Sequence, residues 1–191
     1  MSITRWLPTF LAFPVGGYVA IQSVGSLDGP VTAAIGGLIV GAIIGIAQWL
    51  ALRSRGIGAR WAVYTAAAMM VGSAIAAALT DAATSVGALV VTGMVTGAVV
   101  GVAQSAELRR GRRVAAAWTV VMSLAWGAGW LISANVLVDE ERGFYSFGAS
   151  GALVVTLITG YALRRILAGT GVEASAGTPA ATATPVAGVR R

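Results

Sequence analysis

Apolar runs of about 20 residues recur along this chain, separated by short segments that hold charged residues, glycine or proline. A run of that length crosses a hydrocarbon core of roughly 30 Å as an α-helix, at about 1.5 Å per residue. The pattern therefore predicts six membrane-spanning helices. They cover residues 6–27, 30–52, 61–80, 86–106, 117–138 and 146–163.

Three markers recur in the same order and indicate an internal repeat. Each copy begins at a tryptophan that follows arginine, reaches an acidic residue 20 to 22 positions later, and ends in Leu-Arg at residues 52–53, 108–109 and 163–164. Copies with an even number of spans share one orientation, which favours an axis along the membrane normal. We expect an all-α, six-helix transmembrane bundle of three repeated helical hairpins with pseudo-threefold symmetry. The hairpins cover approximately residues 5–53, 60–109 and 117–165.

Composition agrees with lipid as the main solvent. The chain is 57% hydrophobic and only 10% charged, with a mean hydropathy of +0.83, whereas a soluble domain carries about 25% charged residues. Twelve of the 13 basic residues fall on one side of the predicted bundle, and Arg142 alone falls on the other. An arginine-rich side is typically cytoplasmic, so both termini are expected inside. This placement accounts for the net charge of +6 without a nucleic-acid partner.

The C-terminal segment differs from the rest of the chain. Residues 1–168 form the predicted transmembrane domain, and residues 169–191 are rich in Ala, Thr, Gly and Pro without apolar periodicity. Such a composition does not support a packed core. The sequence therefore predicts a disordered cytoplasmic tail.

Two predicted helices carry glycines at spacings of four, which lie along one helix face. Such a strip lets another backbone approach closely, and close packing drives helix association in lipid. The partner is either an internal helix or another subunit. The two strips are Gly37, Gly41 and Gly45, and Gly93, Gly97 and Gly101.

A glutamine follows each strip by three residues, at Gln48 and Gln104, and Thr159 takes this place in the third copy. A buried amide needs a polar partner. Two roles fit: a polar clasp that joins helices by hydrogen bonds, or a polar ring at the cytoplasmic mouth of a cavity. Because the third copy has no glutamine, a symmetric three-glutamine site is not expected.

The tryptophans that open the three copies are Trp6, Trp61 and Trp118. Each stands near arginine at the start of a helix, and an amphipathic ring suits the membrane–water interface. We expect these three side chains to serve as interface anchors.

Enzyme chemistry is not indicated. The chain has no histidine, cysteine or lysine to act as a base or nucleophile, and its glycine runs lie inside apolar helices rather than after a strand. Cys/His metal sites and histidine-ligated haem are excluded. We expect no catalytic residue, no cofactor and no metal.

The segment "GAIIGIAQWLALRSR", which begins at Gly41, contains the motif G-x3-G-x2-Q-W-x2-L-R. It resembles a repeat in largely uncharacterised small bacterial multi-pass membrane proteins. The second copy, from Gly97, keeps the glutamine and has Ser105 in place of the tryptophan. The resemblance implies a multi-pass protein of the bacterial inner membrane, and it implies no catalytic residues.

Three functional hypotheses follow. The first is a non-enzymatic integral membrane protein that packs against itself or a membrane complex through the glycine strips, as a homo-oligomer or a complex subunit in the lipid bilayer. The alternative is a small transporter or channel with its pathway along the pseudo-threefold axis, lined by Gln48, Gln104, Thr156 and Thr159, with Thr96 added. The third is a binder of a lipid or hydrophobic pigment in the grooves beside the strips.

Overall fold

A computed structural model describes residues 3–136 and 148–168. Within these residues the fold is all-α, and six helical segments are long and apolar enough to cross a membrane, which confirms the predicted number of spans. The first span is composite, and each of the others is one long helix. The elements are α1 Ile3–Trp6, η1 Leu7–Leu11, α2 Ala12–Val24, α3 Pro30–Leu52, η2 Arg53–Arg55, α4 Arg60–Thr80, α5 Val86–Leu108, α6 Arg112–Val136 and α7 Ala149–Ala168.

Local sequence explains where several helices begin or change. Pro8 lies in the first turn of η1, and a proline lacks the N–H that a continuous α-helix would use there. Pro30 opens α3, where the missing N–H has no intrahelical partner to lose. Ser85 precedes α5, and its side chain accepts a hydrogen bond from the backbone N–H of Ala88 at 3.3 Å.

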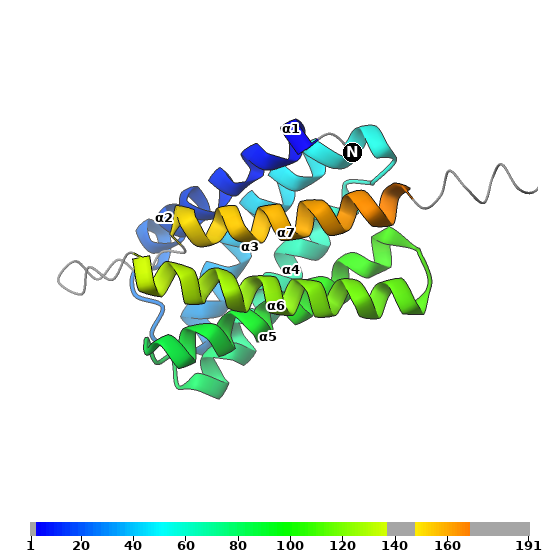
Figure 1. Cartoon of the computed structure of the whole chain (residues 1–191). Helices are drawn as coiled ribbons and strands as arrows, with labels where there is room; N and C mark the ends of the chain where they lie inside the picture. Colours follow the sequence, from blue (N-terminus) through cyan, green and yellow to red (C-terminus); the bar gives the residue numbers. More distant parts are fainter. Residues whose placement is uncertain (1–2, 137–147, 169–191) are drawn as a thin grey trace, which may run out of the picture.

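The helices pack in chain order and close on themselves. Each span contacts the next one, and α7 contacts α1, η1 and α2, so the last span lies beside the first (Figure 1). Consecutive helices run in opposite directions. One end of the bundle therefore holds the connections at residues 53–59 and 109–111, and we call it the arginine end. The other end holds residues 25–29 and 81–85, and we call it the turn end.

The closest helix pairs are α3 with α4 and α5 with α6, which are joined at the arginine end. The glycine strips explain this closeness. A Cβ added at Gly41 would lie 2.5 Å from Met69 Cβ on α4, and one at Gly97 would lie 2.5 Å from the Met122 carbonyl oxygen on α6. Each strip thus has an internal partner helix. The same close approach holds at Gly37 and Gly45 against α4, and at Gly93 and Gly101 against α6.

Three spans have bounds that differ from the sequence expectation by three residues or more. The first covers residues 3–24 rather than 6–27, α6 begins at Arg112 rather than at residue 117, and α7 covers Ala149–Ala168 rather than residues 146–163. α6 begins and α7 ends with residues around arginines that the apolar pattern left out, since helical hydrogen bonding extends beyond the hydrocarbon-facing segment. The predicted tail at 169–191 and the third outer connection lie outside the described residues.

Candidate functional site

A hydrogen-bonded network of buried side chains joins four consecutive helices near the arginine end. Gln48 Oε1 accepts from Trp61 Nε1 at 3.0 Å and from Gln104 Nε2 at 3.3 Å. Gln104 Nε2 also donates to Thr65 Oγ1 at 2.9 Å, while Gln104 Oε1 accepts from Trp118 Nε1 at 3.2 Å. Both amide hydrogens of Gln104 are therefore used, and its oxygen has a donor. The structure brings the two glutamines into direct contact in one network.

A third tryptophan makes a related contact between the first and last spans. Trp6 Nε1 donates to the backbone carbonyl of Thr156 at 2.8 Å, across 150 residues of chain. Thr159, which occupies the glutamine position in the third copy, is buried but donates to the Val155 carbonyl of its own helix at 2.7 Å. The structure therefore does not bring Thr159 into the glutamine network.

The three tryptophans lie inside the bundle, and their role as interface anchors stays a prediction. Trp6, Trp61 and Trp118 are 1%, 0% and 1% exposed, and their indole N–H groups bond to protein acceptors. The physical reason is that a nearby amide or carbonyl satisfies the indole donor, so the ring is free to pack in the core. Their depth in a bilayer stays a prediction.

Leucines cover the network on the side of the arginine end. These are the residues of the three Leu-Arg markers, Leu52, Leu108 and Leu163, and all three are buried in the same hydrophobic core as the tryptophans. The hydrophobic core therefore includes the buried leucines and tryptophans of the half of the bundle that carries the arginines.

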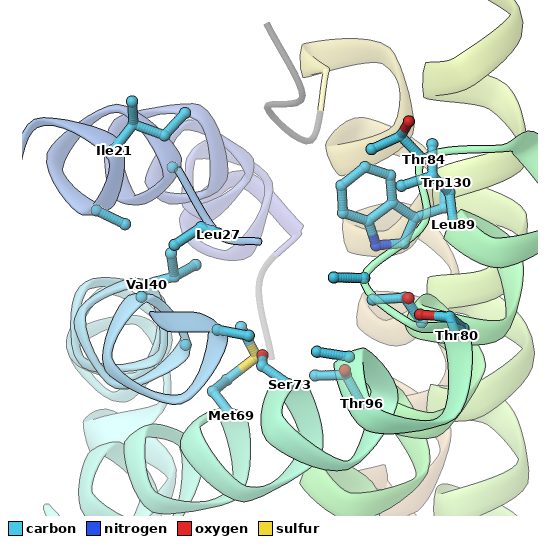
Figure 2. Close-up of a pocket in the computed structure, with 18 of the residues that line it drawn as sticks. Ile21, Leu27, Val40, Met69, Ser73, Thr80, Thr84, Leu89, Thr96 and Trp130 are labelled. Atoms are coloured by element: carbon cyan, nitrogen blue, oxygen red, sulfur yellow. The ribbon is translucent and has the colours of Figure 1, made fainter. Parts of the chain in front are cut away.

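The half toward the turn end contains a cavity of about 610 Å³. Figure 2 shows the opening between α2 and α3 on one side and α5 and α6 on the other, with α4 below. Small residues make the space, because glycine, alanine and serine occupy positions on α2, α3 and α4 where larger side chains would fill it. The lining comprises Phe13, Gly17, Ala20, Ile21, Gly25, Ser26, Leu27, Ala33, Gly36, Gly37, Val40, Ile44, Met69, Ser73, Ala77, Thr80, Ala82, Ala83, Thr84, Leu89, Thr92, Thr96, Trp126 and Trp130.

The cavity reaches deepest along α3, where the lining extends to Ile44, fourteen residues inward from the start of the helix at Pro30. On α5 the lining extends to Thr96, ten residues inward from the start of the helix at Val86. At about 1.5 Å per residue this is roughly 15 Å, or half of a hydrocarbon core of roughly 30 Å. The lining includes neither Gln48 nor Gln104. The cavity and the glutamine network are therefore successive layers of one bundle.

The walls are apolar with scattered hydroxyl groups. None of the described residues that line the cavity is charged, and Phe13, Trp126 and Trp130 contribute aromatic rings. The Phe13 and Trp126 ring centroids lie 5.5 Å apart. Within residues 3–136 and 148–168 no three acidic, histidine or cysteine side chains gather as a candidate metal site. The described lining residues can make apolar contacts, aromatic ring contacts and hydrogen bonds between uncharged groups.

Sequence reasoning missed most of this lining and the tryptophan partners. Thr96 was included as part of a pathway, but the lining residues of α4, such as Ser73 and Ala77, were not. The similar spacings from Gln48 to Trp61 and from Gln104 to Trp118, 13 and 14 residues, were a usable signal for the pairing. The cavity had no comparable signal, because small residues also serve close helix packing.

Comparisons of this chain with protein-family models, with curated proteins and with solved structures found no match.

Proposed function

We propose that this chain is an integral membrane protein that binds a neutral, lipid-soluble small molecule in the cavity at the turn end. The observation that carries the proposal is the cavity itself. Its volume of about 610 Å³ falls in the range of roughly 300–1,000 Å³ typical of small-molecule sites. The described residues of its walls combine aromatic rings and hydroxyl groups without charge, which favours a ligand that partitions into lipid. The proposed role is binding without catalysis, since the described residues of the lining include no acid, base or strong nucleophile.

The layers of the bundle favour a binder over the channel hypothesis. A pathway along the axis would have to pass the Gln48–Gln104 contact and then the buried leucines at the arginine end. Opening it would break several interhelical hydrogen bonds and expose core side chains. We therefore propose that the cavity ends blindly near the middle of the bundle.

The glycine strips support internal assembly more than contact with another subunit. All six strip glycines approach α4 or α6 so closely that an added Cβ would meet an atom of that helix within 3.0 Å. An external partner would need a different surface. The predicted homo-oligomer or membrane complex therefore stays a prediction without support from these residues.

We further propose that the bundle follows a pseudo-threefold plan. Its support is the cyclic order of the tryptophan bonds. Each tryptophan opens one copy of the repeat and donates to the last helix of the preceding copy: Trp61 to α3, Trp118 to α5, and Trp6 to α7. In the third copy the acceptor is a backbone carbonyl instead of a glutamine, so the symmetry of the plan is approximate.

The arginines support one orientation of this bundle. If the arginine end faces the cytoplasm of a bacterial inner membrane, as the positive-inside rule favours, the cavity opens toward the outer side. The ligand would then enter from the outer leaflet or from the space beyond it.

The proposal can be tested with a bromoalkane in detergent or nanodiscs, because bromine quenches indole fluorescence on contact and Trp126 and Trp130 line the cavity. We expect saturable quenching of the wild-type protein. Ala77→Phe places a ring at a lining position of α4 and should abolish the saturable component. Leu79→Phe puts the same ring on an exposed face of α4, where Leu79 is 67% exposed, and should leave it unchanged.

Quenching that rises linearly with probe concentration, and equally in all three proteins, would reduce the effect to partition into lipid and refute the proposal. Far-ultraviolet circular dichroism and size-exclusion profiles establish that both variants keep the helical fold.

A further inference from the structure

Three aromatic side chains are among the described residues of the cavity lining, and Trp130 presents the most accessible ring of the three. Phe13 and Trp126 are 2% and 4% exposed, because their rings pack against each other. Trp130 lies about one helical turn from Trp126 on α6 and is only half-buried. Figure 2 shows its ring directed toward the opening, with Leu27 and Val40 on the opposite side. Part of the Trp130 indole therefore forms wall surface that a bound molecule can touch.

A glycine on the neighbouring helix explains where the Trp130 ring lies. A Cβ added at Gly93 of α5 would lie 2.5 Å from Trp130 Cδ1 and 2.6 Å from the Trp126 carbonyl oxygen. Cδ1 belongs to the five-membered part of the indole, so this edge of the ring rests against the backbone of α5. The six-membered part extends toward the cavity (Figure 2). The close packing of α5 against α6 thus holds the indole in place whether or not a ligand is bound.

Trp130 lies in the outer part of the cavity, toward the turn end. It stands six residues from the end of α6 at Val136, which is roughly 9 Å at about 1.5 Å per residue. Farther into the bundle the lining includes Phe13, Ile44 and Met69, which offer apolar contacts. A molecule that fills the cavity can therefore place a ring beside Trp130 and an apolar substituent deeper in the bundle.

An indole face distinguishes a planar ring from a saturated one. Aromatic pairs in stacked or edge-to-face contact gain about 2- to 12-fold in affinity beyond the effect of the buried area. A saturated molecule of the same size gains only from the area. A cation is also attracted to an indole face, but the described lining residues include no carboxylate to pair with it, and burial of an unpaired charge is costly. The contact therefore favours a neutral ring.

We infer that Trp130 determines the specificity of the cavity, because its indole contacts a planar aromatic or conjugated ring of the ligand. The inference rests on the proposed function and narrows its ligand class. The expected ligand is a neutral, lipid-soluble compound with such a ring, with or without an apolar chain. A lipid with saturated chains and no ring would bind less tightly.

The test compares two probes with one carbon skeleton: 2-butylnaphthalene, which has a planar aromatic ring system, and 2-butyldecalin, which is fully saturated. The assay is isothermal titration calorimetry of the full chain in nanodiscs, with empty nanodiscs to correct for partition into lipid. We expect the wild-type protein to bind butylnaphthalene about 2- to 12-fold more tightly than butyldecalin after this correction. Trp130→Leu should bring the two affinities to about the same value. Trp130→Phe keeps a smaller ring and should keep part of the preference, and it provides a second test if the leucine variant does not fold.

Trp49→Leu is the matched control. Trp49 lies on α3, is also half-buried, and packs against the hydrophobic core without being among the described residues of the cavity lining. The same substitution there should leave the preference for the aromatic probe unchanged. A loss of the preference in Trp49→Leu as well would assign the effect to general loosening of the bundle and would contradict the inference.

The outcomes separate the inference from the proposal on which it rests. If both probes bind saturably with equal corrected affinities, or if Trp130→Leu weakens both equally, the inference is wrong and the cavity proposal stands. If neither probe binds saturably to the wild-type protein beyond its partition into empty nanodiscs, both are wrong.

Discussion

Replacement of Gln104 by leucine tests the network that fills the half of the bundle beside the arginines. Gln104 is 1% exposed and takes part in three interhelical hydrogen bonds, with Gln48, Thr65 and Trp118. Leucine is of similar size and can make none of them. The change therefore removes hydrogen bonding while it keeps most of the packing volume.

The magnitude follows from the number of bonds. Interhelical hydrogen bonds in membrane proteins average about 0.6 kcal/mol each in double-mutant cycles. Three bonds give a loss of about 1.8 kcal/mol for Gln104→Leu. Gln48→Leu removes two bonds and should cost about 1.2 kcal/mol. The double variant removes four distinct bonds rather than five, because the Gln48–Gln104 bond belongs to both residues.

The double variant should therefore cost about 2.4 kcal/mol, and the coupling energy should be about 0.6 kcal/mol. The assay is reversible unfolding in mixed micelles, followed by tryptophan fluorescence and circular dichroism. Thr65 should couple to Gln104 in the same way through its 2.9 Å bond.

A stability that is unchanged or raised in Gln104→Leu would refute the reasoning, because it would mean that the amide gains nothing from these partners. Coupling near zero between the two glutamines would contradict the direct 3.3 Å contact.

Two further predictions concern packing and orientation. Gly97→Ala should lower the free energy of unfolding by about 1–3 kcal/mol, since its Cβ would lie 2.5 Å from a backbone oxygen of α6. Gly87→Ala lies on the same helix with nothing within 4 Å, and it should leave the free energy of unfolding unchanged or raise it by up to about 1 kcal/mol. Equal effects of the two substitutions in a denaturant titration would contradict the close approach. The chain contains no cysteine, so a single introduced cysteine reports which side of the membrane it occupies. In intact cells a membrane-impermeant thiol reagent should label Thr84→Cys, at the turn end, and should not label Ser54→Cys, at the arginine end. The reverse labelling pattern would contradict the proposed orientation.

Much of the architecture could be predicted because it depends on periodicities that a single sequence displays. Six apolar runs gave six helical spans, and glycines at spacings of four marked faces where helices approach closely. A polar contact at Gln48 and Gln104 was also foreseeable, since both glutamines follow a glycine strip by three residues and a buried amide needs a polar partner. The strips alone did not identify the helix that packs against each of them, and only the folded structure shows that these helices are α4 and α6.

The cavity could not be predicted for a different reason. It is a shape produced by five elements together, and its lining positions look individually like ordinary small residues of packed helices. Ala77 and Gly41 are both small residues on membrane helices, yet Ala77 lines open space and Gly41 touches Met69. The tryptophans were placed at the interface because arginine stands near each of them, and their acceptors were invisible without the fold.

The bond between Trp6 and the Thr156 carbonyl has a consequence for biosynthesis. Its donor is made 150 residues before its acceptor, which at roughly 5–20 residues per second is a delay of about 8–30 seconds. Throughout that interval the first span is in the membrane without its neighbour, and its indole N–H needs water or a lipid headgroup instead. Trp6 follows Arg5, and a tryptophan next to arginine is well suited to the membrane–water interface during this interval. The bundle can therefore close only after α7 has been made, and a ribosome that stalls before residue 156 would leave an open, incomplete assembly for membrane quality control.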